Sequence, residues 1–324
     1  MFYVLLFDFK DNIFSQLFPK PISEAARRII PPWWRRPPPS PKPSPTPAPT
    51  ATPTPTPTPV SGQFPLVIGV DSSNLDWWNS KAQSSDIVIG VSYTLSSVSS
   101  AKGGRVMLIS PTNPSSDMDT AKSKGWSYVT ANIEDPNIDL VIGGGVDRDG
   151  NTVIGIKEQY QMAKDRGLTF VNGPTGIQLE DEWDYTYQGQ DHALVRNADI
   201  IAYQAQHFQD NSTELGTSDS SKYASTFASK VKDLISKIKP YIGQQKVWVQ
   251  LSANPPANRC TTADQVIKYI DSIVSGSQPY ADTIVIFVSS QYDSGVDRKG
   301  DGNCVSKGQP TRVDVMKQVV DHYR

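Results

Sequence analysis

Short apolar runs rich in β-branched residues recur along the chain between residues 66 and 288, and a helix-like segment separates most of them from the next. Runs of this length and composition predict β-strands. Strands that alternate with helices in this way are the pattern of a (β/α)8 TIM barrel, a single α/β domain with a closed parallel sheet. The eight predicted strands are residues 66–70, 87–91, 105–109, 127–133, 168–171, 200–203, 246–251 and 283–288.

The segments between the runs differ in length on the two sides of the predicted barrel. Those that lead into a strand are short, and Asp86, Asp199 and Asp282 each follow a small residue and stand directly before a run. Those that leave a strand are long and polar. Barrel enzymes carry their chemistry on the loops after the strands, so this asymmetry predicts that function lies on that face.

Helical periodicity is clearest in residues 223–238, 263–274 and 313–323, where apolar positions fall on one stripe. The third unit of the barrel is the weakest, because only a short helix over residues 118–124 fits there. The connection between the second and third strands is also short. We therefore expect an irregular barrel at this point.

The first 61 residues differ in composition from the rest of the chain. Residues 37–61 are rich in proline and threonine, which predicts an extended stalk typical of exported proteins, with a disordered linker of no specific role as the alternative. Residues 1–36 predict a segment on a membrane surface, or a wrongly assigned start that hides an export signal. We assign the barrel to residues 62–324 and expect an extracellular or cell-surface protein, attached to a membrane or cell wall through its N-terminal segment.

Composition excludes some classes of function. The net charge of −2, with both signs mixed, provides no basic stripe for nucleic acid. The histidines are scattered, and Cys260 and Cys304 form no C-x-x-C spacing, so neither a metal site nor a cofactor is predicted. The two cysteines follow the seventh and eighth strands on the same face, which predicts a disulfide between the two loops; two free thiols are the alternative.

Two Asp-rich segments, residues 145–151 and 295–303, allow two interpretations. Asp147, Asp149 and Asn151 stand at alternate positions, as calcium ligands often do. The glycine comes too early for an EF-hand loop, and no glutamate follows at the right distance. Asp-Gly-Asn is also a good hairpin turn, and we favour the turn.

Polar side chains stand where the predicted strands end, and positive charges are few among them. Amides and acids bind hydroxyl groups, and a tryptophan such as Trp77 stacks on sugar faces, so this combination predicts a carbohydrate or glycan ligand. Besides Trp77, the predicted binding residues are Asn132, Asp135, Asn172, Tyr203, Gln204, Gln206, Gln250, Asn254 and Gln291.

Hydrolysis of a glycoside needs two carboxylates, or one acid helped by the substrate itself. Glu134 is the first choice for the general acid, because a carboxyl flanked by apolar residues at a barrel mouth is expected to have a raised pKa. Asp71, at the end of the first strand, is its predicted helper, with Asp135 and residues 180–182 as other options. For each acid, a solvated loop carboxylate or a helix N-cap is the alternative interpretation.

Part of the chain resembles a family of secreted, mostly uncharacterised bacterial barrel proteins. The resemblance rests on Ala-Asp-Ile-Ile-Ala-Tyr-Gln-Ala-Gln at residues 198–206, on Val-Gln-Leu-Ser-Ala-Asn-Pro-Pro at residues 249–256 and on the late Cys304, and it extends back to Asn132. That family carries a similar Gln-Ala-Gln strand and a Leu-Ser-Thr-Asn-Pro strand. The resemblance implies the barrel and export, and it implies no activity.

A second resemblance concerns sugar hydrolases. Ile-Gly-Val-Asp-Ser-Ser-Asn-Leu-Asp-Trp at residues 68–77 is similar to the opening of family 25 muramidases. Asn132-Ile-Glu134 is similar to the Asp-x-Glu motif of muramidases and family 18 chitinases, from which it departs at Asn132, and Tyr203 falls where chitinases often have a tyrosine. We therefore expect an exported glycoside-hydrolase-like barrel that acts on a polysaccharide or glycan, with a non-catalytic glycan-binding or structural barrel as the alternative.

Overall fold

The structure is a computed structural model, and it describes most of the predicted barrel domain. The described residues are 64–70, 72–91, 98–133, 135, 137–176, 178–179, 192–210, 220–253, 262–274, 281–288 and 310–324.

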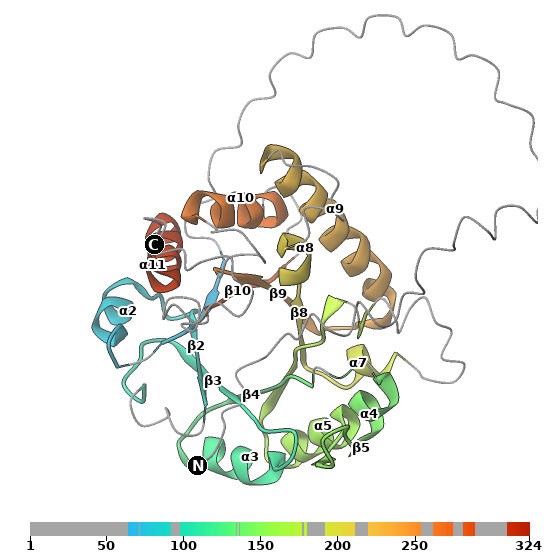
Figure 1. Cartoon of the computed structure of the whole chain (residues 1–324). Helices are drawn as coiled ribbons and strands as arrows, with labels where there is room; N and C mark the ends of the chain where they lie inside the picture. Colours follow the sequence, from blue (N-terminus) through green and yellow to red (C-terminus); the bar gives the residue numbers. More distant parts are fainter. Residues whose placement is uncertain are drawn as a thin grey trace, which may run out of the picture. The chain divides into compact units, whose positions relative to one another are not determined.

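Eight parallel strands close into a barrel, which confirms the predicted fold (Figure 1). Around the barrel the order is β1-β10-β9-β8-β7-β4-β3-β2, so the last strand pairs with the first. The short strands β5 (Gly145–Val146) and β6 (Thr152–Val153) form a separate antiparallel hairpin. The barrel strands are β1 (Leu66–Gly69), β2 (Ile87–Val91), β3 (Gly104–Leu108), β4 (Tyr128–Ala131), β7 (Thr169–Asn172), β8 (Ile200–Gln204), β9 (Lys246–Ser252) and β10 (Thr283–Phe287).

Helices surround the ring of strands (Figure 1). The predicted helix of the third unit is longer than expected, because Pro114 begins α3 and the helix runs to Ser123. The described residues between β2 and β3, 98–103, contain no helix. The helices are α2 (Leu75–Lys81), α3 (Pro114–Ser123), α4 (Ile138–Gly143), α5 (Ile156–Asp165), α7 (Ala193–Arg196), α8 (Gln206–Asp210), α9 (Ser220–Ile238), α10 (Ala263–Val274) and α11 (Arg312–Tyr323), with a 3-10 turn η3 (Lys239–Tyr241) after α9.

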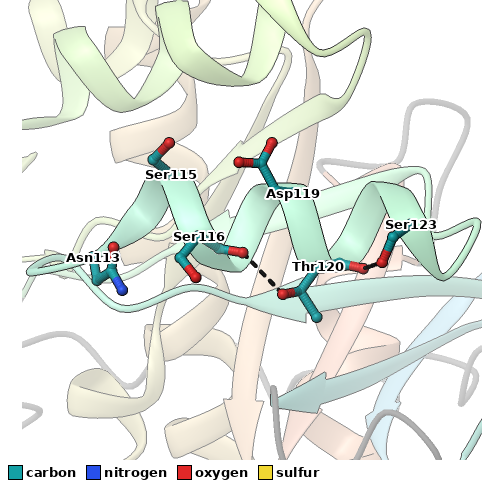
Figure 2. Close-up of a pocket in the computed structure, with 6 residues that line it drawn as sticks. All are labelled: Asn113, Ser115, Ser116, Asp119, Thr120 and Ser123. Atoms are coloured by element: carbon teal, nitrogen blue, oxygen red, sulfur yellow. Dashed lines mark hydrogen bonds between the residues drawn. The ribbon is translucent and has the colours of Figure 1, made fainter.

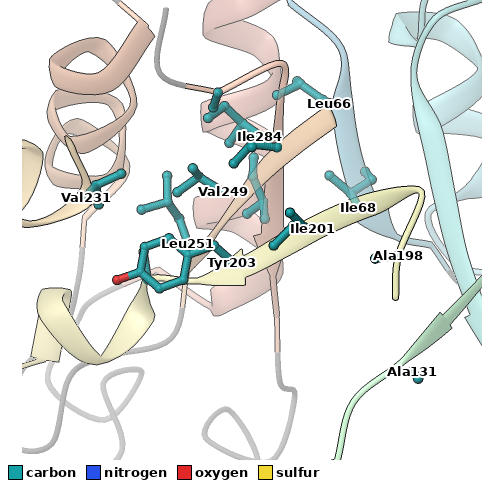
Figure 3. Packing of buried hydrophobic residues seen from close by; sticks show 14 of the residues in the cluster. Leu66, Ile68, Ala131, Ala198, Ile201, Tyr203, Val231, Val249, Leu251 and Ile284 are labelled. Carbon is teal, nitrogen blue, oxygen red and sulfur yellow. The ribbon is translucent and has the colours of Figure 1, made fainter. Parts of the chain in front are cut away.

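Buried apolar side chains form two clusters, one on each face of the barrel wall. The outer cluster fills the space between strands and helices, and Figure 3 shows Leu66, Ile201 and Val249 among its members. The inner cluster lies within the barrel and includes Val106, Val171, Trp248 and Val285. Successive residues of a strand therefore alternate between the inner and the outer cluster. This alternation decides which side chains reach the barrel axis.

The aspartates that precede strands hold the amino-terminal ends of neighbouring strands together. The backbone N–H of Leu66 donates to Asp86 at 2.8 Å, that of Phe170 to Asp199 at 2.9 Å, and that of Val247 to Asp282 at 2.7 Å. In each case the aspartate before one strand accepts from the beginning of the previous barrel strand. The repeated aspartate is therefore a structural feature of the face opposite the predicted functional loops.

Arg324 joins the end of α11 to the first two strands. Its guanidinium donates to both carboxylate oxygens of Asp86, at 2.6 and 3.0 Å, and to the backbone carbonyl of Phe64 at 2.9 Å. Both side chains of the ion pair are fully buried. A buried arginine needs such complete pairing, because a charge without partners in the interior is costly.

The first Asp-rich segment is a hairpin turn, as favoured from the sequence. Asp147 lies between β5 and β6, and its carboxylate accepts from the backbone N–H groups of Asp149 and Asn151 at 2.9 and 2.8 Å. These hydrogen bonds hold the pKa of Asp147 below its usual value. The second segment, residues 295–303, lies outside the described residues. None of the helices in the described part of the chain is long and apolar enough to cross a membrane.

Candidate functional site

Three predicted site residues point toward the barrel axis at the carboxyl ends of the strands, which we call the mouth. Gln250 lies two residues after Trp248 of the inner cluster, and Gln204 lies two residues after Ala202 of the same cluster. Asn132 follows Tyr128, which packs on that cluster, by four residues. Because side chains alternate with a period of two, all three share the inward face of β9, β8 and β4.

Four amide side chains at the mouth are linked by hydrogen bonds into one chain, which we call the amide chain. Gln250 donates through Nε2 to Oε1 of Gln206 at 2.9 Å, and Gln206 donates to Oε1 of Gln204 at 3.2 Å. Gln204 donates to Oδ1 of Asn132 at 2.8 Å and to the backbone carbonyl of Gly173 at 2.6 Å. The chain thus runs from β9 across β8 and β7 to the end of β4.

The carbonyl of Gly173 sets the direction of the whole amide chain. A backbone carbonyl only accepts hydrogen bonds, so the amide nitrogen of Gln204 must face Gly173. Oε1 of Gln204 then faces Gln206, and Oε1 of Gln206 faces Gln250. All dipoles of the chain point the same way, which strengthens each bond. Gln250 is its acceptor end, and within the described part of the chain no group donates to Oε1 of Gln250.

Glycine at position 173 allows this crossing. By alternation from Val171, position 173 faces inward on β7, where a side chain would stand between β8 and β4. A Cβ there would lie 3.2 Å from the carbonyl oxygen of Ala131, which is tight. With no side chain at Gly173, the amide of Gln204 occupies the position and reaches Asn132.

The inward-facing side chains near the mouth are partly exposed to solvent, whereas those deeper in the barrel are buried. Gly69 of β1 is exposed, and a Cβ added to it would meet no atom within 4 Å. Ile89, Leu108 and Thr130 are only half-buried although they share the inward parity of their strands. Trp248 lies two residues before Gln250 on the inward face of β9 and is only 3% exposed, so the interior is already buried at that level. The inward positions near the mouth are therefore less buried than those deeper in the barrel.

Two predicted binding residues face away from the mouth. Asn172 is 2% exposed, and its side chain donates to the carbonyl of Leu194 in α7 at 2.7 Å. Tyr203 is fully buried in the outer cluster beside Phe208, at 6.3 Å between ring centroids, and Figure 3 shows it among aliphatic side chains. Each is adjacent in sequence to an inward position, so the alternation of the strand turns it outward.

Trp77 and Asp135 serve the structure of the helices. Trp77 lies on α2, half-buried against the outer cluster, with the ammonium of Lys317 in α11 5.6 Å from its ring centre. Asp135 accepts from the backbone N–H of Asn137 at 2.8 Å, and Asn137 in turn caps the start of α4. The structure therefore brings neither side chain to the amide chain.

Several predicted residues lie outside the described residues: Asp71, Glu134, residues 180–182, Asn254, Cys260, Gln291 and Cys304. The pairing of Cys260 with Cys304 stays a prediction, as do the stalk, export and attachment to a membrane or cell wall. Among the residues that the structure does describe, no three His, Cys, Asp or Glu side chains are grouped to hold a metal ion.

Sequence reasoning missed two buried glutamines that support the mouth. Gln178 and Thr175 exchange backbone-to-side-chain bonds at 3.0 and 3.1 Å, and Gln178 then donates to the carbonyl of Ile133 at 2.7 Å. Gln209 accepts from the backbone N–H of Ser252 at 2.6 Å and donates to its carbonyl at 3.2 Å. The Thr-x-x-Gln spacing of a capping box was a visible signal for Gln178. Gln209 had no such signal, because its partner is 43 residues away in sequence.

A surface hollow on α3 is a different kind of site. It is lined by Asn113, Ser115, Ser116, Asp119, Thr120 and Ser123, all at or within one helix (Figure 2). The hydroxyls of Thr120 and Ser123 donate to carbonyls of their own helix at 2.9 Å each. Ser115 and Asp119 bind Arg166 after α5, at 2.7 Å each. These side chains join α3 to α5, and the hollow is separate from the amide chain.

Comparison with known proteins identifies no family. No protein-family model and no curated protein matches the chain. Among solved structures, N-(5'-phosphoribosyl)anthranilate isomerase from Pyrococcus furiosus is 12% identical with a TM-score of 0.39, covering 80% of this chain and 98% of that one. The isomerase from Thermotoga maritima is 11% identical with a TM-score of 0.41, covering 81% and 98%. An aldolase named QR15 is 13% identical with a TM-score of 0.38, covering 66% and 82%.

The function expected from the sequence needs correction. The similar structures are isomerases and an aldolase and not glycoside hydrolases, which contradicts the expected glycoside-hydrolase-like activity. The described strand ends of the mouth carry amides, whereas the predicted acids Glu134 and Asp71 lie outside the described residues. The described inward positions at the ends of β4, β8 and β9 carry Asn132, Gln204 and Gln250, which are bonded into one amide chain. Amides carry no proton that titrates, so these positions supply no acid–base pair.

Proposed function

We propose that the barrel binds an uncharged small molecule rich in hydrogen-bonding groups, and that the amide chain recognises it at the mouth. The observation that carries the proposal is the continuous chain Gln250–Gln206–Gln204–Asn132, held in one direction by the carbonyl of Gly173. A network in which each amide is fixed by its neighbours presents donors and acceptors in a set geometry, and such preorganisation reduces the entropic cost of binding.

The absence of charge at the described inward positions near the mouth supports an uncharged ligand. Gly69, Ile89, Leu108, Thr130, Asn132 and Gln250 are the exposed or half-buried inward residues at this end of the barrel, and none of them is ionisable. An anion or cation placed there would lose its hydration without gaining a partner of opposite charge from these residues. A neutral ligand avoids that cost and still satisfies the amides.

The test is a ligand screen on the full chain that compares neutral and anionic probes. We expect acetamide and 2-pyrrolidinone to shift the side-chain amide resonances of Gln204, Gln206 and Gln250 in nuclear magnetic resonance spectra, and to raise the melting temperature as binding to the folded state requires. Inorganic phosphate and acetate should leave these resonances in place. The proposal is wrong if the anions shift these resonances and the neutral probes do not.

Two glutamine variants form a matched pair for this screen. Gln206→Leu keeps the approximate side-chain volume and interrupts the amide chain, so it should weaken binding of the neutral probes. Gln245→Leu changes a half-buried glutamine directly before β9, where Gln245 accepts from the backbone N–H of Gly243 at 2.7 Å. That position is at the opposite end of the barrel. Probe binding should therefore remain at the wild-type level in Gln245→Leu.

A further inference from the structure

The indole N–H of Trp248 is a buried donor inside the barrel, and no described residue accepts a hydrogen bond from it. Trp248 belongs to the inner cluster, is 3% exposed, and lies 6.5 Å from Tyr128 between ring centroids. An indole has one donor and no acceptor, and donors buried in native proteins are almost always paired. An unpaired one therefore indicates a water molecule or a ligand that completes it.

Gln250 supplies a complementary group directly above Trp248. The two residues are two positions apart on the inward face of β9, about 6.6 Å along the strand. Oε1 of Gln250 is the acceptor end of the amide chain, and no group in the described part of the chain donates to it. One wall of the barrel thus offers a donor and an acceptor, one above the other.

Small residues leave room beside this wall. Ala202 is the register partner of Trp248 on β8, and its side chain is short. On β1, Gly69 is exposed and leaves the inward space empty. Glycine inside a strand often marks a place where a ligand approaches the backbone closely. Gln250 itself is half-buried, so its side chain retains some exposure to solvent.

We propose that this wall binds a cyclic amide, whose carbonyl accepts from the indole of Trp248 and whose N–H donates to Oε1 of Gln250. The inference rests on the proposed function and names its ligand class. A lactam holds its N–H and C=O on one edge, which matches a donor and an acceptor on the same face of one strand. Its apolar ring carbons face the aliphatic side chains of the inner cluster, such as Val285, next to Gln250 in register.

The test follows the indole N–H resonance of Trp248 in the full chain, labelled with nitrogen-15 in its tryptophan rings. Titration with 2-pyrrolidinone should move this resonance downfield, as formation of a hydrogen bond does. Cyclopentanone has the same ring size and a carbonyl but no N–H. It should bind about three- to tenfold more weakly, the value of one ordinary hydrogen bond.

Variants test each contact separately. Gln250→Leu should remove the preference for 2-pyrrolidinone over cyclopentanone, and Trp248→Phe should weaken both probes by about three- to tenfold. Trp126→Phe is the matched control, because Trp126 is also 3% exposed but belongs to the outer cluster. Affinity in Trp126→Phe should equal that of the wild type.

The outcomes separate this inference from the proposed function. If 2-pyrrolidinone moves the amide resonances of Gln204 and Gln206 but leaves the Trp248 indole resonance unchanged, the mouth binds neutral ligands and the inference about Trp248 is wrong. If it moves neither set, both proposals are wrong. The wild-type indole resonance needs no variant, so this readout holds even if Trp248→Phe fails to fold.

Discussion

At the scale of single residues, the mouth depends on which of two adjacent side chains faces inward. Gln204 points to the barrel axis and joins the amide chain, while its neighbour Tyr203 is fully buried outside the barrel wall. On β7, Gly173 faces inward and provides a carbonyl, while Asn172 bonds to α7. The polar character of a residue at a strand end therefore does not by itself place it in the site.

Asp117 and Asp119 on α3 offer a test of electrostatics at this scale. Burial raises the pKa of Asp117 above its usual value, against the opposing effect of the Ser110 N–H, which donates to it at 2.7 Å. A carboxyl with a raised folded-state pKa favours folding below its unfolded pKa, and this contribution is lost as pH rises through the folded pKa. Asp117→Asn should therefore gain stability relative to the wild type as pH rises between about 3 and 7.

For Asp119, on the same helix, the opposite dependence of stability on pH is expected. The guanidinium of Arg166 donates to Asp119 and holds the pKa of that carboxyl below its usual value. Its stabilising contribution is present above the unfolded pKa and is lost as pH falls. Asp119→Asn should thus lose stability relative to the wild type as pH rises. Urea unfolding of both variants over the pH range checks the signs, and equal slopes would contradict the assignment.

At the scale of elements, the barrel is closed by contacts between parts of the chain that are far apart in sequence. β10 pairs with β1, and Arg324 after α11 binds Asp86 before β2 and the carbonyl of Phe64 before β1. The three aspartates before β2, β8 and β10 each accept a backbone N–H from the previous barrel strand. These contacts of the amino-terminal face stabilise the barrel, whereas the binding that we propose uses the carboxyl-terminal face.

A comparison of two ion pairs tests this closure. Arg324→Met leaves the carboxylate of Asp86 buried without its cation, so the free energy of unfolding should fall by about 3–5 kcal/mol. Lys81→Met removes an ion pair with Asp321, at 2.9 Å, whose side chains are 38% and 45% exposed. That pair also joins α2 to α11, yet its loss should cost at most about 1 kcal/mol. Urea unfolding distinguishes the two, and similar losses would contradict the closing role of Arg324.

At the scale of the whole molecule, the described fold lies within one compact unit. Residues 56–324 form that unit, and every strand and helix of the barrel belongs to it. The described members of both apolar clusters and of the amide chain also belong to this unit. The residues on which the proposed binding rests therefore all lie in the barrel unit.

A shortened chain tests this domain division. A protein that comprises residues 62–324 should fold and keep a melting temperature within about 2 °C of the full chain, since it retains every described strand and helix. It should also bind 2-pyrrolidinone with the affinity of the full chain. Calorimetry and the titration described above measure both quantities. A large drop in melting temperature would show that residues 1–61 contribute to the barrel.

Much of the fold could be predicted because each strand is a short apolar run and each helix has its own periodicity. Residues 246–251 and 263–274 are predicted almost as β9 and α10 appear. The inward and outward faces could not be predicted in the same way. Both faces of a barrel strand are buried, so apolar residues occupy both and the usual alternation of polar and apolar positions is lost. For this reason the sequence predicted Asn172 and Tyr203 at the mouth, although both side chains face outward in the structure.

By itself, the sequence determined the elements of this protein, their order and the face on which the long loops lie, because these depend on local composition and on the chirality of parallel strand connections. Only the tertiary structure decided which strand-end residues meet. Asn132, Gln204 and Gln250 come from three strands separated by up to 118 positions (250 − 132), and closure of the barrel brings their amides within hydrogen-bonding distance through Gln206. Two features of the closed sheet allow this contact. One is the alternation that turns each of these side chains inward, and the other is the absence of a side chain at Gly173.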